Sequence, residues 1–321
     1  RSGTDALMIV LRAWNIGPGD AVFVPAFTFA ASAEVVALVG AEPVFVDVLE
    51  DTYNMDPASL EAAIALVKRE GKLKPRAVMP VDLFGQPADY RKLEPIVRGE
   101  NLLLLCDAAQ GFGGLLDGRR SGGIGDAAAT SFFPAKPLGC YGDGGAVFTN
   151  DAALDELLRS IRMHGQGSDR YENVRIGVNS RLDTIQAAIL LEKLKVFPQE
   201  IEMREAVARR YNEAFHATNS VRAPHVIDGA QSTWAQYTIQ VADREKFQAD
   251  MKAKGVPTAV YYPIPLSLQK GYKGFPSAPT PVSERISKSV VSLPMHPDLD
   301  AATQDRIILA VLESVGPASR S

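Results

Sequence analysis

"TDALMIVLRAWNIGPGDAVFVPAFTFAASAEVVALVGAEPVFVDV", residues 4–48, is the stretch that decides the fold. Residues 4–14 place apolar side chains at helical spacing, and residues 21–27 form a short apolar run typical of a buried strand. A second helical pattern at 30–40 and a second apolar run at 43–48 repeat the alternation. Alternating helices and buried strands predict an α/β fold, with a mostly parallel sheet covered by helices on both faces.

The alternation continues beyond this stretch and then changes. Further strands are predicted at 76–85, 101–109, 127–133 and 144–150, and further helices at 87–98, 151–163 and 181–195. After a long helical stretch at 199–216, the pattern predicts a strand at 234–241, a helix at 243–254, strands at 257–263 and 289–294, and a final helix, with a surface loop at 271–282. We therefore predict a large domain over residues 1–200 and a smaller C-terminal α+β domain over 201–321.

Composition excludes several classes of protein. The 321 residues are 46% hydrophobic and 22% charged, with a net charge of −4 and interspersed signs, so we expect neither nucleic acid nor a membrane surface as a partner. No apolar run approaches the roughly 18 to 20 residues of a membrane span, and the start lacks a secretory signal, which favours a cytoplasmic location. Cys106 and Cys140 lack CxxC spacing, so we expect no disulfide and no metal site.

One lysine stands in an unusual environment. In "TSFFPAKPLGCYGDGGA", residues 130–146, Lys136 is surrounded by small, apolar and glycine residues. Loop lysines are usually solvated and inactive. A desolvated lysine, however, loses part of its preference for the charged form, as Schiff-base chemistry with a carbonyl requires. Because ligands bind at the carboxyl ends of the strands in open α/β sheets, Lys136 and the preceding Ser131 are expected to face one crevice.

Asp107 is the second candidate. It ends the apolar run "LLLLC" and is predicted to place a carboxylate at the end of a buried strand, where an unpaired charge is costly. A protonated pyridine nitrogen would be a suitable partner, since a Schiff-base lysine and an aspartate beside the pyridinium are what proteins contribute to pyridoxal phosphate chemistry. The alternative is that Asp107 caps the next helix or pairs with an arginine.

The stretch "SGTDALMIV" supplies the third candidate feature. Gly3, Thr4 and the backbone of Asp5 lie where a helix begins, and free amides at a helix N-terminus bind phosphate. Serine and threonine before a helix are also ordinary N-caps. The combination of a phosphate site, a carboxylate at a strand end and an enclosed lysine in one α/β chain is what indicates a pyridoxal phosphate enzyme.

At these residues the chain resembles the sugar aminotransferases of the DegT/DnrJ/EryC1/StrS family, which use pyridoxal 5′-phosphate and have the type I aspartate aminotransferase fold. The resemblance covers nearly the whole chain, and the family usually has further residues before "SGT", so we expect an N-terminal segment before Arg1. The matching motifs are "SGTDAL", "GPGD", "VPAFTFAASAE", "GAEPVFVDV", "DAAQGFG", "TSFFPAKPLGCYGDGGA", "HGQ", "GVNSRLDTIQAAIL", "VPTAVYYPIPL" and "SLPMHP".

The resemblance implies roles for individual residues. Lys136 would carry the cofactor as a Schiff base, and Asp107 would pair with its pyridine nitrogen. Gln110 would contact the hydroxyl side of the cofactor and Phe29 would stack on its ring. The phosphate would be held by Gly3, Thr4, the Asp5 backbone, Ser131 and, from the neighbouring subunit of a homodimer with shared active sites, Asn179. Asn179 could also be only a turn residue before a helix.

The resemblance also implies a reaction. An amino acid, expected to be L-glutamate, would give its amino group to the cofactor in a ping-pong sequence, and a nucleotide-linked ketosugar would receive it. The motifs are most similar to the branch that acts on a UDP-2-acetamido-3-keto-hexuronic acid for O-antigen and lipopolysaccharide synthesis. Tyr261 stands where that branch has histidine, so a 4-keto-6-deoxy sugar nucleotide is the alternative substrate. His164, Tyr261 and Tyr262 are candidate substrate contacts, or are packing and loop residues.

Two other classes of protein were considered. A nicotinamide-dependent Rossmann enzyme would need GxGxxG after its first strand, and the chain has none there. A non-catalytic binding or regulatory homologue would be expected to lack Lys136 or Asp107, and both are present. Family members that are sugar dehydratases have histidine at the lysine position, so Lys136 favours amino transfer.

Overall fold

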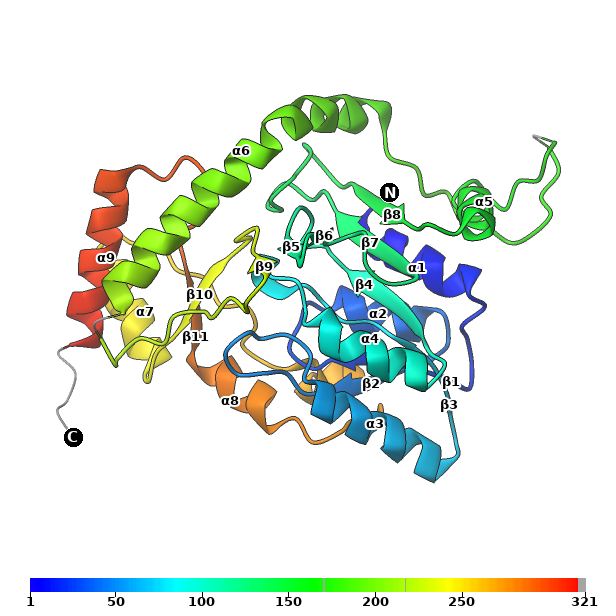
Figure 1. The fold of residues 1–321 in the computed structure, drawn as a ribbon, viewed down its shortest axis with the longest axis horizontal. Coiled ribbons are helices and arrows are strands. Elements are labelled where there is room, and N and C mark those ends of the chain that lie inside the picture. Colours follow the sequence, from blue (N-terminus) through cyan, green and yellow to red (C-terminus); the bar gives the residue numbers. More distant parts are fainter. Residues whose placement is uncertain (170, 217, 317–321) are drawn as a thin grey trace.

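A computed structural model of the chain describes residues 1–169, 171–216 and 218–316 (Figure 1). Its centre is a six-stranded sheet in which the first five strands in spatial order are parallel and the last is antiparallel. The predicted α/β fold with a mostly parallel sheet is therefore confirmed. In spatial order the strands are β2 (Glu42–Val46), β1 (Asp20–Pro25), β3 (Lys74–Val78), β4 (Leu103–Asp107), β7 (Ala127–Ser131) and β8 (Gly145–Phe148).

Helices cover both faces of this sheet. Alternate residues of β1 face opposite sides, so Val22 and Val24 join one hydrophobic core while Ala21 and Phe23 join the other. The first core contains residues of α1 (Gly3–Ala13), α2 (Ala31–Leu38) and α5 (Ala152–Ile161), and the second contains residues of α3 (Pro57–Glu70) and α4 (Tyr90–Gly99). Every residue of β1 is buried, as expected for a strand covered on both faces.

The longest helix corrects one expectation. Helical stretches at 181–195 and 199–216 were predicted separately, but α6 (Thr184–Phe215) is one helix with Pro198 inside it. Phe197 and Ile201 of α6 pack against Gly113, where an added Cβ would lie 2.7 Å from Phe197 Cε1. Gly113 therefore contacts α6 on both sides of Pro198, a residue that cannot donate a backbone hydrogen bond. In Figure 1, α6 runs along one side of the molecule from the large sheet to α9.

The C-terminal part has its own core. Strands β10 (Tyr237–Gln240) and β11 (Val290–Leu293) pair antiparallel, and they pack with the second half of α6, α7 (Arg244–Ala253) and α9 (Ala301–Val315). We propose the division near residue 200 as the domain boundary, which would fall within α6. The remaining elements are β5 (Leu115–Leu116), β6 (Arg119–Arg120), β9 (Ala230–Gln231), α8 (Pro281–Ser289) and the short 3₁₀ helices η1 (Leu83–Gly85), η2 (Leu266–Leu268) and η3 (Lys270–Tyr272).

One local prediction was wrong, and another is correct for most of its length, since residues 273–280 form neither helix nor strand. The expected strand at 257–263 forms only one isolated β-bridge, between Ala259 and Ser292, because the following residues leave the sheet and pack over the carboxyl end of β1. The expected loop at 271–282 overlaps the start of α8, which has a proline at its first turn. Its N-terminus is held from outside the helix, because the buried Asp47 accepts hydrogen bonds from the backbone amides of Val282 (2.9 Å) and Ser283 (2.8 Å).

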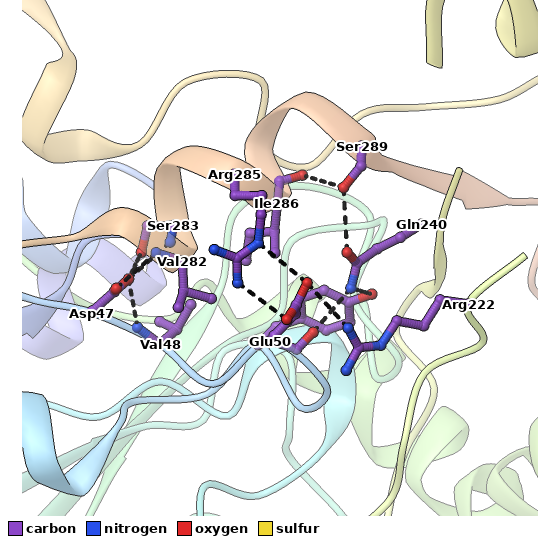
Figure 2. Close-up of polar contacts among 11 residues, drawn as sticks. Asp47, Val48, Glu50, Arg222, Gln240, Val282, Ser283, Arg285, Ile286 and Ser289 are labelled. Atoms are coloured by element: carbon purple, nitrogen blue, oxygen red, sulfur yellow. Dashed lines mark hydrogen bonds and ion pairs between the residues drawn. The ribbon is translucent and has the colours of Figure 1, made fainter. Parts of the chain in front are cut away.

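An ion-pair cluster lies beside this cap (Figure 2). Glu50 contacts Arg222 and Arg285, each with a nitrogen to oxygen distance of 3.1 Å. The two guanidinium groups, Arg285 first, lower the pKa of Glu50. Gln240 of β10 donates to the carbonyl oxygen of Glu50 at 2.9 Å. The segment after β2 is therefore joined to both β10 and α8. Within the described residues no helix is both long and apolar enough to cross a membrane.

Candidate active site

The carboxyl ends of the parallel strands bring the candidate residues to one edge of the sheet. Phe29 follows β1, Asp107 ends β4 and Lys136 follows β7. The register aligns these ends, since Asp107 pairs with Ala129 of β7 and forms a parallel bridge with Val81 after β3. Ligands bind at this edge in open α/β sheets.

Asp107 is a buried carboxylate with defined partners. Its side chain is 4% exposed, and its Oδ2 accepts a hydrogen bond from Ser32 Oγ at 2.8 Å. Its Oδ1 accepts a bond from the Ala109 amide at 3.1 Å. Burial raises the pKa of Asp107, while these hydrogen bonds and the charge of Lys136 act in the opposite direction. The carboxylate is thus fixed in orientation and retains lone pairs for a cationic ligand.

Lys136 lies in the turn after β7. Its backbone amide donates to Phe133 O at 2.8 Å, and its side chain is half-buried. Burial lowers the pKa of the Lys136 amine, and the negative charge of Asp107 partly offsets this by raising it. The lysine and the aspartate therefore lie close enough to influence each other's protonation, as the sequence suggested for two groups at neighbouring strand ends.

The start of α1 contacts the end of β7. A Cβ on Gly3 would lie 2.7 Å from Ser131 Cβ, so only glycine permits this approach. Ser2 is the N-cap, and its Oγ accepts the Asp5 amide at 3.1 Å. Among the described residues the amides of Gly3 and Thr4 have no acceptor, because the first turn of a helix lacks intrahelical partners. An anion beside Ser131 would be bound by these two amides, while the Asp5 amide is already engaged.

Gln110 connects two further candidates. It is 3% exposed, its Oε1 accepts the Phe84 amide at 2.7 Å, and its Nε2 donates to Tyr262 Oη at 3.2 Å. The ring of Tyr262 lies 6.3 Å from the ring of Phe29, which is 55% exposed. Gln110, Tyr262 and Phe29 thus form a connected group. Burial raises the pKa of Tyr262, the hydrogen bond from Gln110 lowers it, and the negative charge of Asp107 raises it.

Two candidates lie outside this group, and a third, Tyr261, lies beside it. His164 and Asn179 belong to the segment between α5 and α6. The outer part of this segment extends away from the sheet (Figure 1), whereas Ser180, next to Asn179, donates to Asp5 Oδ2 in α1 at 3.0 Å. His164 N donates to Val178 O at 3.0 Å, and Asn179 Oδ1 accepts from Arg181 Nε at 3.1 Å. Neither has a described contact with Lys136 or Asp107. Tyr261 packs edge-on against Tyr262, with ring centroids 5.9 Å apart, and is exposed on its other side.

Sequence reasoning missed two residues. Ser32, the hydroxyl partner of Asp107, is buried in α2, and its only signal is a polar residue in an otherwise apolar helix start. Asp82 follows β3 and is fully buried, and nothing in "VDLFG" distinguishes it from an ordinary turn aspartate. A cavity of about 670 Å³ lies along β8, lined by residues such as Phe112, Arg120 and Phe148, but neither Lys136 nor Asp107 lines it.

Comparison with known proteins gives consistent matches. The model of the DegT/DnrJ/EryC1/StrS aminotransferase family matches residues 1–312. A Pseudomonas aeruginosa protein, UDP-2-acetamido-2-deoxy-3-oxo-D-glucuronate aminotransferase, is 48% identical over 311 residues, which are 97% of this chain and 84% of that protein.

Solved structures agree with this match. The crystal structure of a DegT DnrJ EryC1 StrS aminotransferase from Brucella abortus has a TM-score of 0.95 and 55% identity, covering 97% of this chain and 83% of that one. The structure of NtdA from Bacillus subtilis with the cofactor PMP bound has a TM-score of 0.87 and 30% identity, covering 98% and 72% of the two chains. The similarity extends over all the elements that carry the candidate site.

Proposed function

This chain belongs to the DegT/DnrJ/EryC1/StrS aminotransferase family, and from that premise we propose that it transfers an amino group from an amino acid to a nucleotide-linked ketosugar. The cofactor is pyridoxal 5′-phosphate, and the donor is L-glutamate. The observation that carries the proposal is the pair formed by Lys136 and Asp107, an amine of lowered pKa and a buried, hydrogen-bonded carboxylate at the same edge of the sheet.

The residues at this edge suit the cofactor. The free amides of Gly3 and Thr4, with Ser131 beside them, would hold its phosphate, and Asp107 would hold its protonated ring nitrogen. Phe29 would stack on the ring, and Gln110 would contact its hydroxyl side. Pyridoxal phosphate supplies an aldehyde that amines attack and a ring that accepts the electrons of a breaking C–H bond.

The protein's own groups move the protons. Lys136 Nζ would hold the cofactor and, once free, would be the base that takes the proton from the α-carbon of the donor amino acid and then the acid that gives it up. A lowered pKa suits both steps, because the amine must be neutral to attack a carbonyl and to accept a proton. Asp107 stays ionised once a cationic ring faces it, and the Ser32 hydroxyl keeps its carboxylate in place.

The sugar substrate is a UDP-2-acetamido-3-keto-hexuronic acid. Support comes from the 48% identity to the Pseudomonas aeruginosa protein, whose name states this 3-oxo glucuronate. Tyr262, which accepts a hydrogen bond from Gln110, and Tyr261 beside it would contact the sugar. His164 would reach the substrate only from a segment that lies apart from this site in the single chain.

The proposal also covers the pathway, the cellular location and the oligomeric state of the protein. The product serves cell-surface polysaccharide synthesis, namely O-antigen and lipopolysaccharide. The reaction takes place in the cytoplasm, where nucleotide-linked sugars and free amino acids occur together. The protein acts as a homodimer in which Asn179 reaches the phosphate of the neighbouring subunit. The dimer is supported by exposed apolar side chains that follow the first half of α6 and adjoining loops, namely Tyr141, Ile176, Ile185, Leu191 and Leu194.

Absorption spectroscopy tests the cofactor and the first half-reaction. Wild-type protein with pyridoxal phosphate should develop the visible band of the lysine-bound cofactor, and L-glutamate should convert it to a near-ultraviolet band. Lys136→Ala should not develop the visible band, whereas Lys246→Ala, which removes an exposed lysine of α7 that pairs with Asp250, should behave as wild type. A wild-type protein without the band would instead favour the non-catalytic, regulatory reading of this fold.

A substrate comparison tests the sugar. Protein preloaded with the amino form of the cofactor should regain the visible band with the UDP-3-keto-hexuronic acid and not with a dTDP-4-keto-6-deoxy sugar. The reverse preference would assign the chain to the 4-keto-6-deoxy class of substrates and would leave the aminotransferase function intact.

A further inference from the structure

The orientation of Gln110 is set by one backbone amide. Because the Phe84 N–H can only donate, the oxygen of the Gln110 side chain must face it, and the Nε2 group must face Tyr262. Tyr262 Oη then accepts from Gln110, which leaves the phenolic proton to be donated elsewhere in the candidate site. The position of a single amide therefore determines which way two polar side chains point.

That amide belongs to a residue in an unusual conformation. Phe84 has φ of 58°, in the left-handed region that non-glycine residues rarely adopt. It lies in the 3₁₀ turn η1, and such a conformation persists only where the surroundings hold it. The carbonyl groups of the turn are held by the C-terminal part, since Thr233 N donates to Gly85 O at 2.9 Å.

The entry to the turn is held by Asp82. Its carboxylate is fully buried, and Oδ1 accepts from the Ala88 amide at 2.9 Å and from Tyr90 Oη at 2.8 Å. Its Oδ2 accepts from the hydroxyl of Ser121 and from Cys106 Sγ. Asp82 thus joins the two ends of the turn 82–88 and anchors them to β4 and to the loop after β6.

Asp82 also lies directly against the backbone next to Gln110. A Cβ on Gly111 would clash with Asp82 Cβ, so the two residues are in direct contact. The Asp82 amide donates to Asp107 O at 3.0 Å. The carboxylate therefore lies behind both Asp107 and Gln110 and has no described contact with the open side of the site.

We propose that Asp82 is a positioning residue for the cofactor site, which holds the Phe84 amide in place and through it fixes the orientation of Gln110 and Tyr262. The role of Asp82 in cofactor binding rests on the proposed function. Its effect on the position of the Phe84 amide can be measured in cofactor-free protein. Burial raises the pKa of Asp82 to about 6, which agrees with a carboxylate held in place by the fold rather than by solvent.

The first test uses hydrogen exchange without cofactor. Asp82→Asn should speed exchange of the Phe84 amide, because an amide group cannot accept all of the four donors that face the carboxylate. Asp20→Asn is the matched control, since Asp20 is also buried and accepts from Gly17 N and Arg76, but lies at the amino end of β1. If the Phe84 amide exchanges equally in both variants, Asp82 does not hold the turn and the proposal is wrong.

The second test is a double-mutant cycle on cofactor affinity, measured by titration with pyridoxal phosphate. Asp82→Asn should weaken cofactor binding by about threefold or more in the wild-type background, which is the lower end of the coupling energies found for residues in contact. In the Gln110→Ala background the same substitution should weaken binding much less. Equal weakening in both backgrounds would mean that Asp82 acts on the fold alone and would overturn the proposal. Asp20→Asn should be additive with Gln110→Ala.

A milder variant covers the case in which Asp82→Asn does not fold. Tyr90→Phe removes one donor to Asp82 Oδ1 and keeps the buried ring, and the same faster exchange and the same non-additivity with Gln110→Ala are expected. Failure of wild-type protein to bind pyridoxal phosphate would contradict the proposed function, whereas the exchange experiment would still decide the structural role of Asp82.

Discussion

Burial acts in opposite directions on the two ionisable groups of the candidate site. It lowers the pKa of the Lys136 amine and raises the pKa of the Asp107 carboxyl, so that each group is moved toward its neutral form. Each charge also stabilises the other, which limits both shifts. The pair is therefore sensitive to any change that removes one charge or one hydrogen bond.

The pKa of Lys136 can be measured by its rate of acetylation across a pH series, with mass spectrometry of the labelled peptide. We expect a midpoint below 10.5, the ordinary lysine value, because burial disfavours the ammonium form. Asp107→Asn should lower the midpoint further, since the carboxylate raises it. Asp126→Asn, which removes a partner of Arg98 away from the site, should leave the midpoint unchanged. A midpoint at or above 10.5 would contradict the burial argument.

The hydroxyl of Ser32 should matter to catalysis although it touches no substrate. Ser32→Ala removes a hydrogen bond to Asp107 that lowers its pKa, so the acid limb of the pH–activity profile should move to higher pH. The rate at neutral pH should fall by about tenfold, as hydrogen bonds to charged groups contribute about 1.5–3 kcal/mol. Ser314→Ala on α9 is the control, because that hydroxyl bonds to Ala310 O and Met251 Sδ in the C-terminal part and not to Asp107. An unchanged profile would show that Asp107 does not depend on Ser32.

Asp82 should make stability depend on pH. Its pKa is raised to about 6 from 3.8, because burial disfavours the carboxylate, so the folded protein holds this proton more tightly than the unfolded chain. The resulting stabilisation is complete below 3.8 and is lost as pH rises through about 6. Tyr90 and Cys106, which face Asp82, also have pKa values raised by burial and stay protonated there.

Denaturation in urea at pH 4 and pH 7 checks this expectation. Relative to Asp82→Asn, wild-type protein should lose stability between the two pH values, because the variant has no proton to lose at this position. A constant difference between the two proteins would show that Asp82 does not titrate in this range.

At the scale of single elements, α8 depends on a residue far away in the sequence. Asp47 accepts the amides of Val282 and Ser283, and also the Ser283 hydroxyl at 2.6 Å, so the helix is capped from the end of β2. Asp47→Ala should lower the free energy of unfolding by about 2 kcal/mol, the upper range for N-caps, because buried donors lose their acceptor.

The matched control for this cap is Asp56→Ala. Asp56 caps α3 locally by accepting the Ala58 amide in an exposed position, so its loss should cost about 1 kcal/mol or less. Urea denaturation compares the two variants. A larger effect of Asp56→Ala would show that the cap of α8 contributes little to holding the two parts of the chain together.

The elements differ in how far the sequence predicts them. The strands β1 and β4 were predictable because each is an apolar run with one aspartate at one end, Asp20 in β1 and Asp107 in β4, and lies between clear helical patterns. The continuity of α6 through Pro198 was not, since it depends on Phe197 and Ile201 packing against Gly113, far away in the sequence. The start of α8 was also not predictable, because its cap comes from Asp47, which is far away in the sequence.

The candidate site divides in the same way. Lys136 and Asp107 were recognisable because each is a charged residue in apolar surroundings at a strand end. Ser32 and Asp82 were not recognisable, because each contacts its partners only in the folded protein. Ser32 bonds to Asp107, and Asp82 bonds to Ala88 and Tyr90. Polar residues whose function lies in one distant contact leave no local pattern.

At the scale of the whole molecule, the proposed dimer makes a specific prediction. If Lys136 and Asn179 of one site come from different subunits, neither Lys136→Ala nor Asn179→Ala protein would have a complete site. Mixed dimers formed by refolding the two together would contain one complete site each, so the mixture should recover about a quarter of the wild-type activity. The measurement is the glutamate half-reaction at limiting cofactor, with each variant refolded alone as the control. No gain on mixing would contradict shared sites.

The continuity of α6 has a mechanical consequence. A helix of 32 residues is roughly 48 Å long, and its two halves pack into different cores, so it forms a rigid connection between them. Any movement of the C-terminal part toward the sheet must bend α6 or shift it against the side chains that it packs on. The helix bends most easily at Pro198, because one backbone hydrogen bond is missing there. The helix α6 is thus one of the connections, with Asp47 and Glu50, that limit how far the two parts can move relative to each other.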